Sequence, residues 1–338
     1  MVGCRQEVFL SLSAVMFMTL KPNSKKSLTI SIVSWNTKDL TLNCIKSIYE
    51  TERDFTLRII VVDNNSSDGS AKAIKKAYPE VLVLENETNK GFAAANNQAL
   101  AVSDSDFFLL LNPDTIVNKD SLKGMLDFLV HHTTVGAVGP RLVYPDGSLQ
   151  KSYSTQFPSL AMILRHHGLL KEPDPSHKIV LEKPIPVACL MGACLMLRRR
   201  AIEDVGPMDE AFFLIYEEAD WCYRLNKSGW LVYHLPQFTA VHYQGQSEKL
   251  IPGKGIIETQ ISLQYYLRKH YGILTVILGI LLMISIHSIW FIKNEIKAMI
   301  FGESEQIEYR RALNKYVLLG QILAIKHFLS SIMNGSRT

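Results

Sequence analysis

Several carboxylate side chains in this chain are spaced so that they could act together in one reactive site. Asp63 and Asp114 each follow an apolar, strand-like run, and Glu217, Glu218 and Asp220 lie close together in the chain. A carboxylate at a strand end can accept a hydrogen bond from a nucleobase N–H. Crowded carboxylates repel one another, and burial can leave one of them as a general base. Asx turns and the acidic first turn of a helix are the structural alternatives.

Asp114 is also a candidate metal ligand. It follows Asn112 and Pro113 at the end of an apolar run. A diphosphate in a crevice there needs a cation, and a hard divalent ion held by one or two carboxylates and phosphate oxygens is the usual solution. His242, after the β-like run 238–241, is a candidate for a further ligand. A turn-capping aspartate and a purely structural histidine remain the alternatives.

The segment Asn89-Lys90-Gly91 offers a surface for a phosphate or a sugar. Gly91 permits a close approach of the backbone. The alanine-rich segment after it predicts a helix, whose first amides can hold an anion or a polar sugar edge. An ordinary loop before a packed helix is the alternative.

The elements that would position these residues alternate over the first half of the sequence. Apolar β-branched runs predict strands, and apolar residues at helical spacing predict helices. The predicted strands are 28–34, 58–63, 81–85 and 107–111, and the predicted helices are 37–50, 67–78, 91–102 and 120–131. This alternation predicts an α/β fold, a mostly parallel sheet with helices on both faces. Ligands bind such sheets at the C-terminal ends of the strands.

The pattern is mixed from residue 135 onward. The predicted elements are strands at 138–144 and 191–198, a turn at 145–148 and a helix at 217–227. The segment 152–186 has no clear periodicity and is predicted to be irregular.

The segment 273–292 is the strongest apolar run, and its roughly 20 residues are enough to cross a bilayer. Tyrosines precede it and Trp290 lies near its end, as at a membrane interface. Basic residues flank both ends, so they indicate no orientation. A buried helix or an interfacial hairpin is the alternative. Residues 1–27 contain a shorter apolar run without a cleavage pattern, and we expect a dispensable or interfacial extension rather than a signal peptide.

Composition and missing motifs disfavour several functions. The net charge of +4 is weak, and no basic stripe indicates nucleic-acid binding. The first predicted strand leads into Ser34-Trp35-Asn36 without a G-x-G-x-x-G motif, and no P-loop is present, which disfavours hydride transfer and ATP hydrolysis. The five cysteines form no C-x-x-C pair, which favours free thiols in a reducing compartment.

The stretch 28–247 resembles the inverting family 2 glycosyltransferases, and within them the bacterial rhamnosyltransferase-like branch of polysaccharide and O-antigen synthesis. The resemblance rests on seven motifs in the same order: V-S-W-N, I-V-V-D-N-N-S-S-D-G-S, N-K-G-F-A-A-A-N-N, L-L-N-P-D-T, G-A-C-L-M-L-R-R, F-F-L-I-Y-E-E-A-D-W-C-Y-R and H-Y-Q-G-Q-S. It implies the GT-A nucleotide-diphospho-sugar transferase fold.

The resemblance also implies roles for single residues. Asp114 stands where the family has a D-x-D motif and would carry Mg²⁺ or Mn²⁺ alone, with His242 approaching the metal. Glu218 matches the catalytic base, but the pair Glu217-Glu218 replaces the usual Glu-Asp, so either glutamate remains a candidate. The expected donor-binding residues are Ser34, Trp35, Asn36, Asp63, Asn65, Asn89, Lys90, Gly91, Asn96 and Asn112, with Asp63 on the base. The expected acceptor-binding residues are Gly192 and Ala193, and the expected catalytic residues are Glu218, Glu217 and Asp220.

The expected activity is inverting transfer of a sugar from a nucleotide-diphosphate donor to a hydroxyl of a lipid-linked or polysaccharide acceptor. The branch favours dTDP-rhamnose, and a UDP-hexose donor is the alternative. A non-catalytic membrane-anchored scaffold is the alternative of another class. A nucleotidyltransferase would need a basic glycine-rich loop after the first strand, which is absent.

The expected location is the cytoplasmic face of a bacterial inner membrane, either peripheral or single-pass. We expect the extension 1–27, a catalytic domain 28–250 and a helical, membrane-associated region 251–338. The catalytic domain would divide into a nucleotide-binding half, 28–118, and an acceptor half, 119–250. No feature indicates an oligomeric state.

Overall fold

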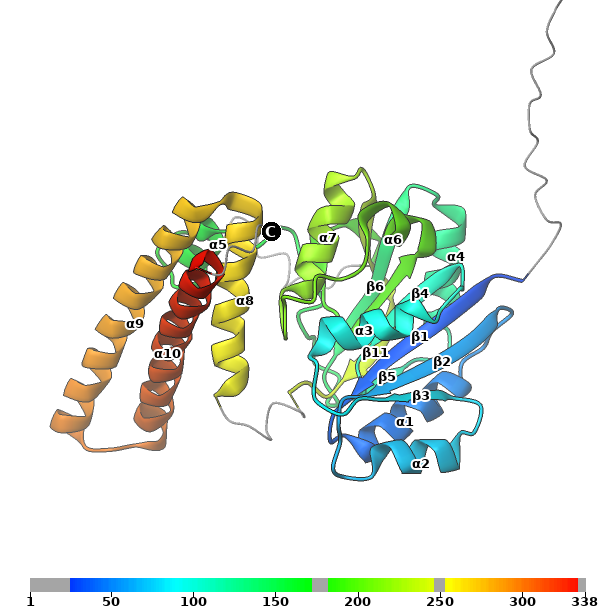
Figure 1. The fold of residues 1–338 in the computed structure, drawn as a ribbon, viewed down its shortest axis with the longest axis horizontal. Coiled ribbons are helices and arrows are strands. Elements are labelled where there is room, and N and C mark those ends of the chain that lie inside the picture. Colours follow the sequence, from blue (N-terminus) through cyan, green and yellow to red (C-terminus); the bar gives the residue numbers. More distant parts are fainter. Residues whose placement is uncertain (1–24, 172–181, 246–252, 334–338) are drawn as a thin grey trace, which may run out of the picture.

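The computed structural model describes residues 25–171, 182–245 and 253–333. An α/β part comes first, and long helices from the C-terminal part of the chain stand beside it (Figure 1). Almost all of the predicted extension 1–27 lies outside the described residues.

Four parallel strands begin the sheet, in the order β3-β2-β1-β4. They are β1 (Ser27–Ser34), β2 (Thr56–Asp63), β3 (Leu82–Glu85) and β4 (Phe107–Leu111), connected through α1 (Lys38–Tyr49), α2 (Ser70–Ala77) and α3 (Phe92–Ala101). In β2, Ile59 and Val61 pack in one core with α1, whereas Ile60 and Val62 pack in a second core with α3. Burial on both faces explains why these strands are continuous apolar runs.

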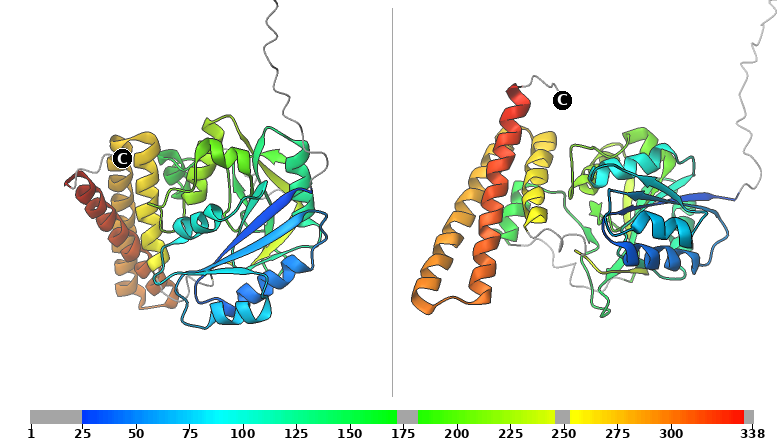
Figure 2. Two further views of the ribbon diagram at one scale, coloured as in Figure 1. Left: turned by 45° about the vertical axis from the view of Figure 1, so that its right-hand side comes forward. Right: turned by 60° about the horizontal axis from the view of Figure 1, so that its bottom comes forward.

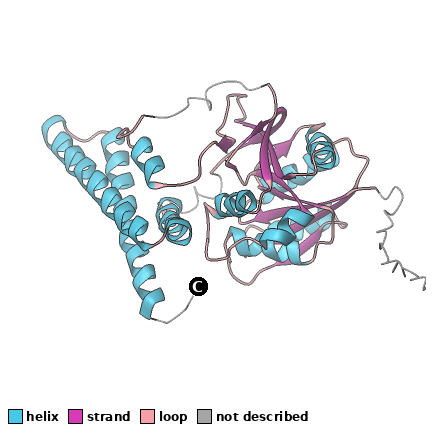
Figure 3. Ribbon diagram, turned by 90° about the horizontal axis from the view of Figure 1, so that it is seen from above, coloured by secondary structure: helices cyan, strands magenta, loops and turns pink. Residues whose placement is uncertain are grey.

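The sheet continues through the second half of the α/β part in the order β10-β6-β11-β5, and β8 pairs with β11. These elements are β5 (Thr115–Val117), α4 (Ser121–His131), β6 (Val135–Val143), β8 (Ile185–Pro186), β10 (Cys194–Arg198), α6 (Arg199–Val205), α7 (Glu217–Lys227) and β11 (Leu231–His242). Strand β10 is antiparallel to both neighbours, while β6 and β11 run parallel. Two short strands, β7 (Tyr153–Ser154) and β9 (Cys189–Leu190), form a separate pair. The predicted α/β fold, with helices on both faces of the sheet, is confirmed (Figure 3).

Three predicted elements differ from the structure. Helix α2 begins at Ser70 instead of residue 67, because Gly69 takes a left-handed conformation and the Asp68 carboxylate accepts from the Ser70 amide at 3.0 Å. The segment 152–186 is not wholly irregular, since it contains α5 (Leu160–His166), which the Ser159 side chain caps. The strand predicted at 191–198 begins only at Cys194.

Three helices make up the C-terminal part: α8 (Lys254–Tyr271), α9 (Ile273–Phe301) and α10 (Glu305–Met333), seen from two further sides in Figure 2. Among the described residues, α9 is the one helix long and apolar enough to cross a membrane. Apolar side chains on its outer face are exposed, Leu274 by 67% and Ile289 by 64%. In contrast, the glutamines between α8 and α10 are buried and hydrogen-bond to one another.

An ion-pair cluster fastens α7 to α8. The Asp220 side chain of α7 is fully buried, and its Oδ1 lies 2.7 Å from Lys269 Nζ and 2.8 Å from His270 Nε2. Its Oδ2 accepts from Arg224 Nε at 2.8 Å. Burial alone would raise the pKa of Asp220, but the hydrogen bond from His270 and the charges of Arg224 and Lys269 lower it to about 2. The cluster therefore holds the start of α7 against the C-terminal helices.

We predict that Asp220→Asn lowers the free energy of unfolding by about 3 kcal/mol, because it removes the buried carboxylate that Arg224 and His270 share and one of the two carboxylates beside Lys269. The folded pKa of about 2 lies below the roughly 3.9 of an unfolded aspartate, so this stabilisation is fully present above about pH 4 and is lost as the pH falls toward 2. Chemical denaturation between pH 2 and 7, values chosen to span that window, measures both effects. The control is Asp204→Asn, which removes an exposed partner of Arg200. Equal losses in the two variants would contradict the prediction.

Candidate functional site

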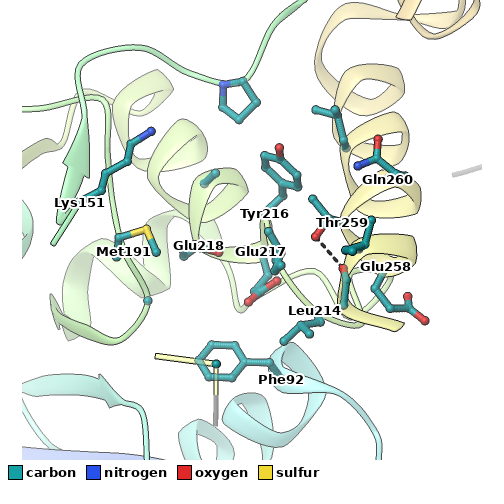
Figure 4. A pocket seen from close by; sticks show the side chains of 18 of the residues that line it. Phe92, Lys151, Met191, Leu214, Tyr216, Glu217, Glu218, Glu258, Thr259 and Gln260 are labelled. Atoms are coloured by element: carbon teal, nitrogen blue, oxygen red, sulfur yellow. Dashed lines mark hydrogen bonds between the residues drawn. The ribbon is translucent and has the colours of Figure 1, made fainter. Parts of the chain in front are cut away.

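A cavity of about 890 Å³ lies between the C-terminal ends of the strands and the C-terminal helices. Figure 4 shows Glu217, Glu218 and Phe92 on its α/β side and Thr259 and Gln260 of α8 on the other. The residues singled out from the sequence that line it are Trp35, Asn89, Gly91, Asn112, Asp114, Gly192, Ala193, Glu217, Glu218 and His242. The fold therefore gathers into one space residues that are far apart in the chain.

Asp114 and His242 lie next to each other in the lining of this cavity. Asp114 follows β4, His242 ends β11, and the Asp114 Oδ1 lies 3.3 Å from His242 Nε2. Both side chains are buried, and the Tyr243 amide donates to the Asp114 carbonyl at 3.0 Å. Asn112 Nδ2 lies 3.4 Å from the same histidine nitrogen. Among the described residues no cluster of three His, Cys, Asp or Glu side chains is suited to a metal ion, so this pair supplies two ligands at most.

Gln150 sets the orientation of the His242 ring. His242 Nδ1 lies 2.8 Å from Gln150 Oε1, and Gln150 Nε2 donates to Gln244 Oε1 at 3.0 Å. This network makes Nδ1 the donor of the neutral ring and directs the lone pair of Nε2 toward Asp114. Two electron-pair donors that face each other across 3.3 Å are suited to a cation between them. The donor set thus fits a hard divalent ion that takes its other ligands from phosphate oxygens and water.

Asp63 lies at the end of β2 and is 4% exposed. Its Oδ2 accepts from the Ser66 amide at 3.0 Å, while its buried Oδ1 has no hydrogen-bond partner among the described residues. A buried acceptor without a donor is costly unless a ligand supplies one. This arrangement fits a ligand N–H at the end of β2.

Other expected donor-binding residues shape the loops without lining the cavity. Asn36 and Asn65 adopt positive φ, and the Asn36 Oδ1 accepts from the Ser67 amide at 2.7 Å. Ser34 is buried and its hydroxyl lies 3.1 Å from that of Thr41. Asn96 bridges α3 to β1, because its Oδ1 accepts from Ser31 and its Nδ2 donates to the Phe92 carbonyl. Ser34 and Asn96 thus make internal hydrogen bonds in this structure, and their contact with a donor stays a prediction.

Gly91 lies where the loop before α3 contacts the loop before α7. Its φ is +85°, and the amide of the following residue, Phe92, donates to the Phe213 carbonyl at 2.9 Å. A Cβ on Gly91 would lie 2.6 Å from that carbonyl oxygen. Lys90 donates its amide to Asn64 Oδ1 at 3.4 Å and does not line the cavity. The loop before α3 and the loop before α7 consequently hold each other in place.

Glu217 and Glu218 begin α7 behind a strained turn. Ile215 and Tyr216 have φ of 69° and 73°, which a β-branched or bulky residue rarely adopts. Such strain persists only where the surroundings impose it, and it concentrates at functional sites. Here it turns both glutamates toward the cavity, where Glu218 lies against Gly192.

The two glutamates have different surroundings. Burial, and then the charge of Glu218, raises the pKa of Glu217 well above its ordinary range. Burial also raises the pKa of Glu218, but backbone amides, including that of Gly192, oppose this effect. Each side chain has a buried Oε2 without a hydrogen-bond partner among the described residues. Because two such carboxylates do not ionise together readily, Glu217 is the better holder of a proton and Glu218 the better anion.

Asp220 does not belong with the other two carboxylates. It does not line the cavity, and its oxygens are engaged by Arg224, Lys269 and His270. The sequence pattern grouped it with Glu217 and Glu218 because helical spacing alone does not reveal which side of α7 faces a partner. Its surroundings are those of a structural ion pair.

Several lining residues were missed from the sequence. Asn64 ties the end of β2 to the loop before α3 through a 3.0 Å bond to the Gly91 carbonyl. Gln150, which contacts His242 but does not itself line the cavity, was also missed, because no sequence signal indicated this contact. The basic and aromatic residues of α5 and α9 that line the cavity, Arg165, His166, His167, His287 and Trp290, were likewise not predicted.

Comparisons with known proteins agree with the predicted fold and family. The family model described as "Glycosyl transferase family 2" matches residues 29–206. The N-acetylglucosaminyl-diphospho-decaprenol L-rhamnosyltransferase of Mycobacterium tuberculosis is 31% identical over 222 residues, 58% of this chain and 69% of that protein. The low-salt glycan biosynthesis hexosyltransferase of Haloferax volcanii is 26% identical over 223 residues, 64% and 67% of the two chains.

A solved structure supports the fold alone. GalNAc-T7 with UDP, GalNAc and Mn²⁺ aligns with a TM-score of 0.51 at 13% identity, over 71% of this chain and 48% of that one. The sheet, its crevice and these similarities define a glycosyltransferase of the GT-A fold. The chain belongs to glycosyl transferase family 2, as its motifs predicted.

We predict that Gly91→Ala destabilises the protein by about 3 kcal/mol, because the added methyl group meets the Phe213 carbonyl and the positive φ disfavours a side chain. Gly206→Ala is the matched control, since Gly206 has nearly the same backbone conformation, φ 79° and ψ 176°, but no atom within 4 Å of the position of a Cβ. That control should cost only about 1 kcal/mol, the conformational part. Urea denaturation measures the difference, and equal costs would show that the contact with Phe213 is unimportant.

Proposed function

We propose that this protein is an inverting glycosyltransferase that transfers a sugar, with rhamnose from dTDP-rhamnose as the leading donor, to a hydroxyl of a lipid-linked or polysaccharide acceptor. The observation that carries the proposal is the shared cavity, which Glu217 and Glu218 line together with Asp114 and His242. A base and a binding site for an anionic leaving group are the two parts that such a transfer needs. The name of the mycobacterial relative supports rhamnose and a lipid diphosphate acceptor.

Glu218 is the proposed general base. Its carboxylate takes the proton from the acceptor hydroxyl as the hydroxyl oxygen forms a bond to the anomeric carbon. The bond from that carbon to the donor phosphate oxygen breaks at the same time, and the nucleoside diphosphate leaves with the electron pair. Attack opposite to the leaving group inverts the anomeric configuration. Glu217, which lies beside it and has fewer backbone hydrogen bonds to favour its anion, remains protonated and avoids a second buried charge.

Asp114 and His242 are the proposed ligands of Mg²⁺ or Mn²⁺, with Gln150 orienting the histidine. A divalent ion at this position would neutralise charge on the leaving diphosphate. The short distance between two electron-pair donors supports this role. Asn112, which contacts His242, would lie beside the same diphosphate.

The other proposed contacts include Asp63, which lies at the end of β2 outside the lining of the cavity, and residues that line the cavity. Asp63 Oδ1 would accept the N–H of the nucleobase, and its lack of a donor among the described residues supports this. Trp35, Asn89 and Gly91 would contact the donor from the same side. Gly192 and Ala193 would line the acceptor side, where Gly192 leaves room beside Glu218.

A membrane position is also part of the proposal. The exposed apolar face of α9 supports association with the cytoplasmic face of a bacterial inner membrane. Residues 28–250 would form the catalytic unit and 251–338 the membrane-associated region. A UDP-hexose donor is the second candidate, and the uridine diphosphate bound to GalNAc-T7 is the observation that favours it.

We predict that Glu218→Gln lowers kcat by about 10²–10⁴-fold while donor affinity is retained, because an amide cannot accept the proton. Glu217→Gln should lose much less, since glutamine resembles a protonated glutamate. The acid limb of the wild-type rate profile should lie above pH ~4.3, the ordinary glutamate value, because burial raises the pKa of Glu218. Steady-state kinetics across pH test all three points. A larger loss in Glu217→Gln would transfer the role of base to Glu217.

We predict that dTDP-rhamnose raises the melting temperature in the presence of Mg²⁺ or Mn²⁺ and that Asp114→Ala removes the metal-dependent part of this shift. A thermal-shift panel of dTDP- and UDP-sugars, with metal and with EDTA, makes the measurement. Asp146→Ala is the control, since Asp146 is an exposed aspartate in a turn. A shift that neither metal nor Asp114→Ala alters would refute the metal site. A panel without any response, together with absent turnover, would favour the non-catalytic scaffold.

A further inference from the structure

The helical side of the cavity contains basic groups that the proposed reaction does not use. Arg165 and His166 end α5 and His167 follows them, while His287 lies in α9, and all four line the same cavity as Glu218. The ring centroids of His167 and His287 are 5.1 Å apart, and those of His166 and His167 are 5.2 Å apart. These residues form a compact basic cluster between two helices.

Polar atoms of this cluster are buried without partners. Arg165 Nε, His167 Nδ1 and His287 Nε2 have no hydrogen-bond partner among the described residues. His287 is only 4% exposed, and its other nitrogen lies 2.7 Å from Asn314 Oδ1. The guanidinium N–H is a donor in every state, and each histidine nitrogen becomes a donor when the ring is protonated.

The electrostatic setting indicates a missing anion. Within the described parts of the chain no carboxylate forms an ion pair with a member of this cluster. Burial, followed by the neighbouring His287 and His166, lowers the pKa of His167 to about 4. A phosphate oxygen placed among these groups would favour the protonated rings and would receive their N–H donors. Glu258 lines the cavity as well, from the start of α8, as do Lys254 of the same helix and Lys151.

Apolar surface adjoins the basic cluster. Leu263, Met283, Leu313 and Val317 line the cavity from α8, α9 and α10. Trp290 packs against the rings of His167 and His287, at centroid distances of 5.2 and 5.5 Å. Beyond Trp290 the outer face of α9 exposes Ile289 by 64% and Ile292 by 57%. A ligand at this end would meet the Arg165 cation, imidazole rings that can take up a proton, and hydrocarbon together.

We propose that Arg165, His167 and His287 form an anion subsite that holds the diphosphate of a lipid-linked acceptor, with its hydrocarbon chain along α9. This inference rests on the proposed function, since it assigns the end of the cavity opposite the donor to the acceptor. A sugar on that diphosphate would then extend toward Glu218. The cluster thereby selects acceptors that carry both a phosphate and an apolar chain.

Binding of farnesyl diphosphate in EDTA tests the subsite without turnover. EDTA removes metal-dependent binding of the diphosphate at Asp114, and calorimetry or thermal shift in detergent gives the affinity. Arg165→Gln and His167→Gln, alone and combined, should weaken binding by roughly tenfold for each lost charged hydrogen bond. Arg200→Gln and His131→Gln are matched controls, because both residues are exposed and lie outside the cavity. Both controls and Asp114→Asn should bind farnesyl diphosphate like the wild type.

Two further probes identify the source of the phosphate. Farnesol has the chain without the charge, and inorganic pyrophosphate has the charge without the chain; both should bind more weakly than farnesyl diphosphate. Unchanged affinity in the double variant, loss of binding in Asp114→Asn, or pyrophosphate binding as tight as that of farnesyl diphosphate would each overturn the proposal. The melting temperature of each variant without ligand shows that it is folded, and the response to dTDP-rhamnose with Mg²⁺ in the Arg165 and His167 variants shows that the donor site is intact. That response can fail while farnesyl diphosphate binding persists, so the two proposals fail separately.

Discussion

The contact between Asp114 and His242 is the constraint on which the site depends. It joins the end of β4 to the end of β11, two strands that are separated in the sheet by β10 and β6. The pairing of β11 with β5 brings His242 opposite Thr115, directly after Asp114. A carboxylate and an imidazole nitrogen face each other there inside a buried crevice, an arrangement that needs a cation or a proton to be favourable. The sheet thus fixes an electrostatic requirement that the proposed divalent ion would meet.

The second constraint acts on the turn before α7. Ile215 and Tyr216 adopt positive φ at a cost of about 1–3 kcal/mol each. Contacts from three directions offset that cost: the Phe213 carbonyl accepts from Phe92, the Leu214 carbonyl accepts from Ser262, and Asp220 is held by α8. The position of Glu217 and Glu218 is therefore determined as much by the C-terminal helices as by the sheet. Loss of α8 would release the proposed base.

The part of the structure that follows local rules could be predicted from the sequence. Strands β1, β2 and β4 are buried on both faces and are therefore apolar throughout, and the residues at their ends could be assigned to one crevice. Long-range contacts could not be predicted this way. Gln150 contacts His242 across 92 positions in the chain. Asp220 and Glu218 are two positions apart in α7 and so point to opposite sides of the helix, but only the tertiary structure shows that an ion pair meets one side and the cavity the other.

The arrangement of the two parts has a consequence for how catalysis and membrane binding depend on each other. A transferase whose acceptor is anchored in a bilayer must keep its catalytic base at a constant distance from the membrane surface. Helix α8 contributes Thr259 and Gln260 to the cavity, and it contributes Lys269 and His270 to the ion-pair cluster around Asp220. Helix α9 carries the exposed apolar face. A movement of these helices relative to the sheet would displace the turn before α7 and Glu218 with it. The helices that would meet the lipid also hold the proposed base. The position of these helices on the membrane and the geometry of proton transfer would therefore depend on each other.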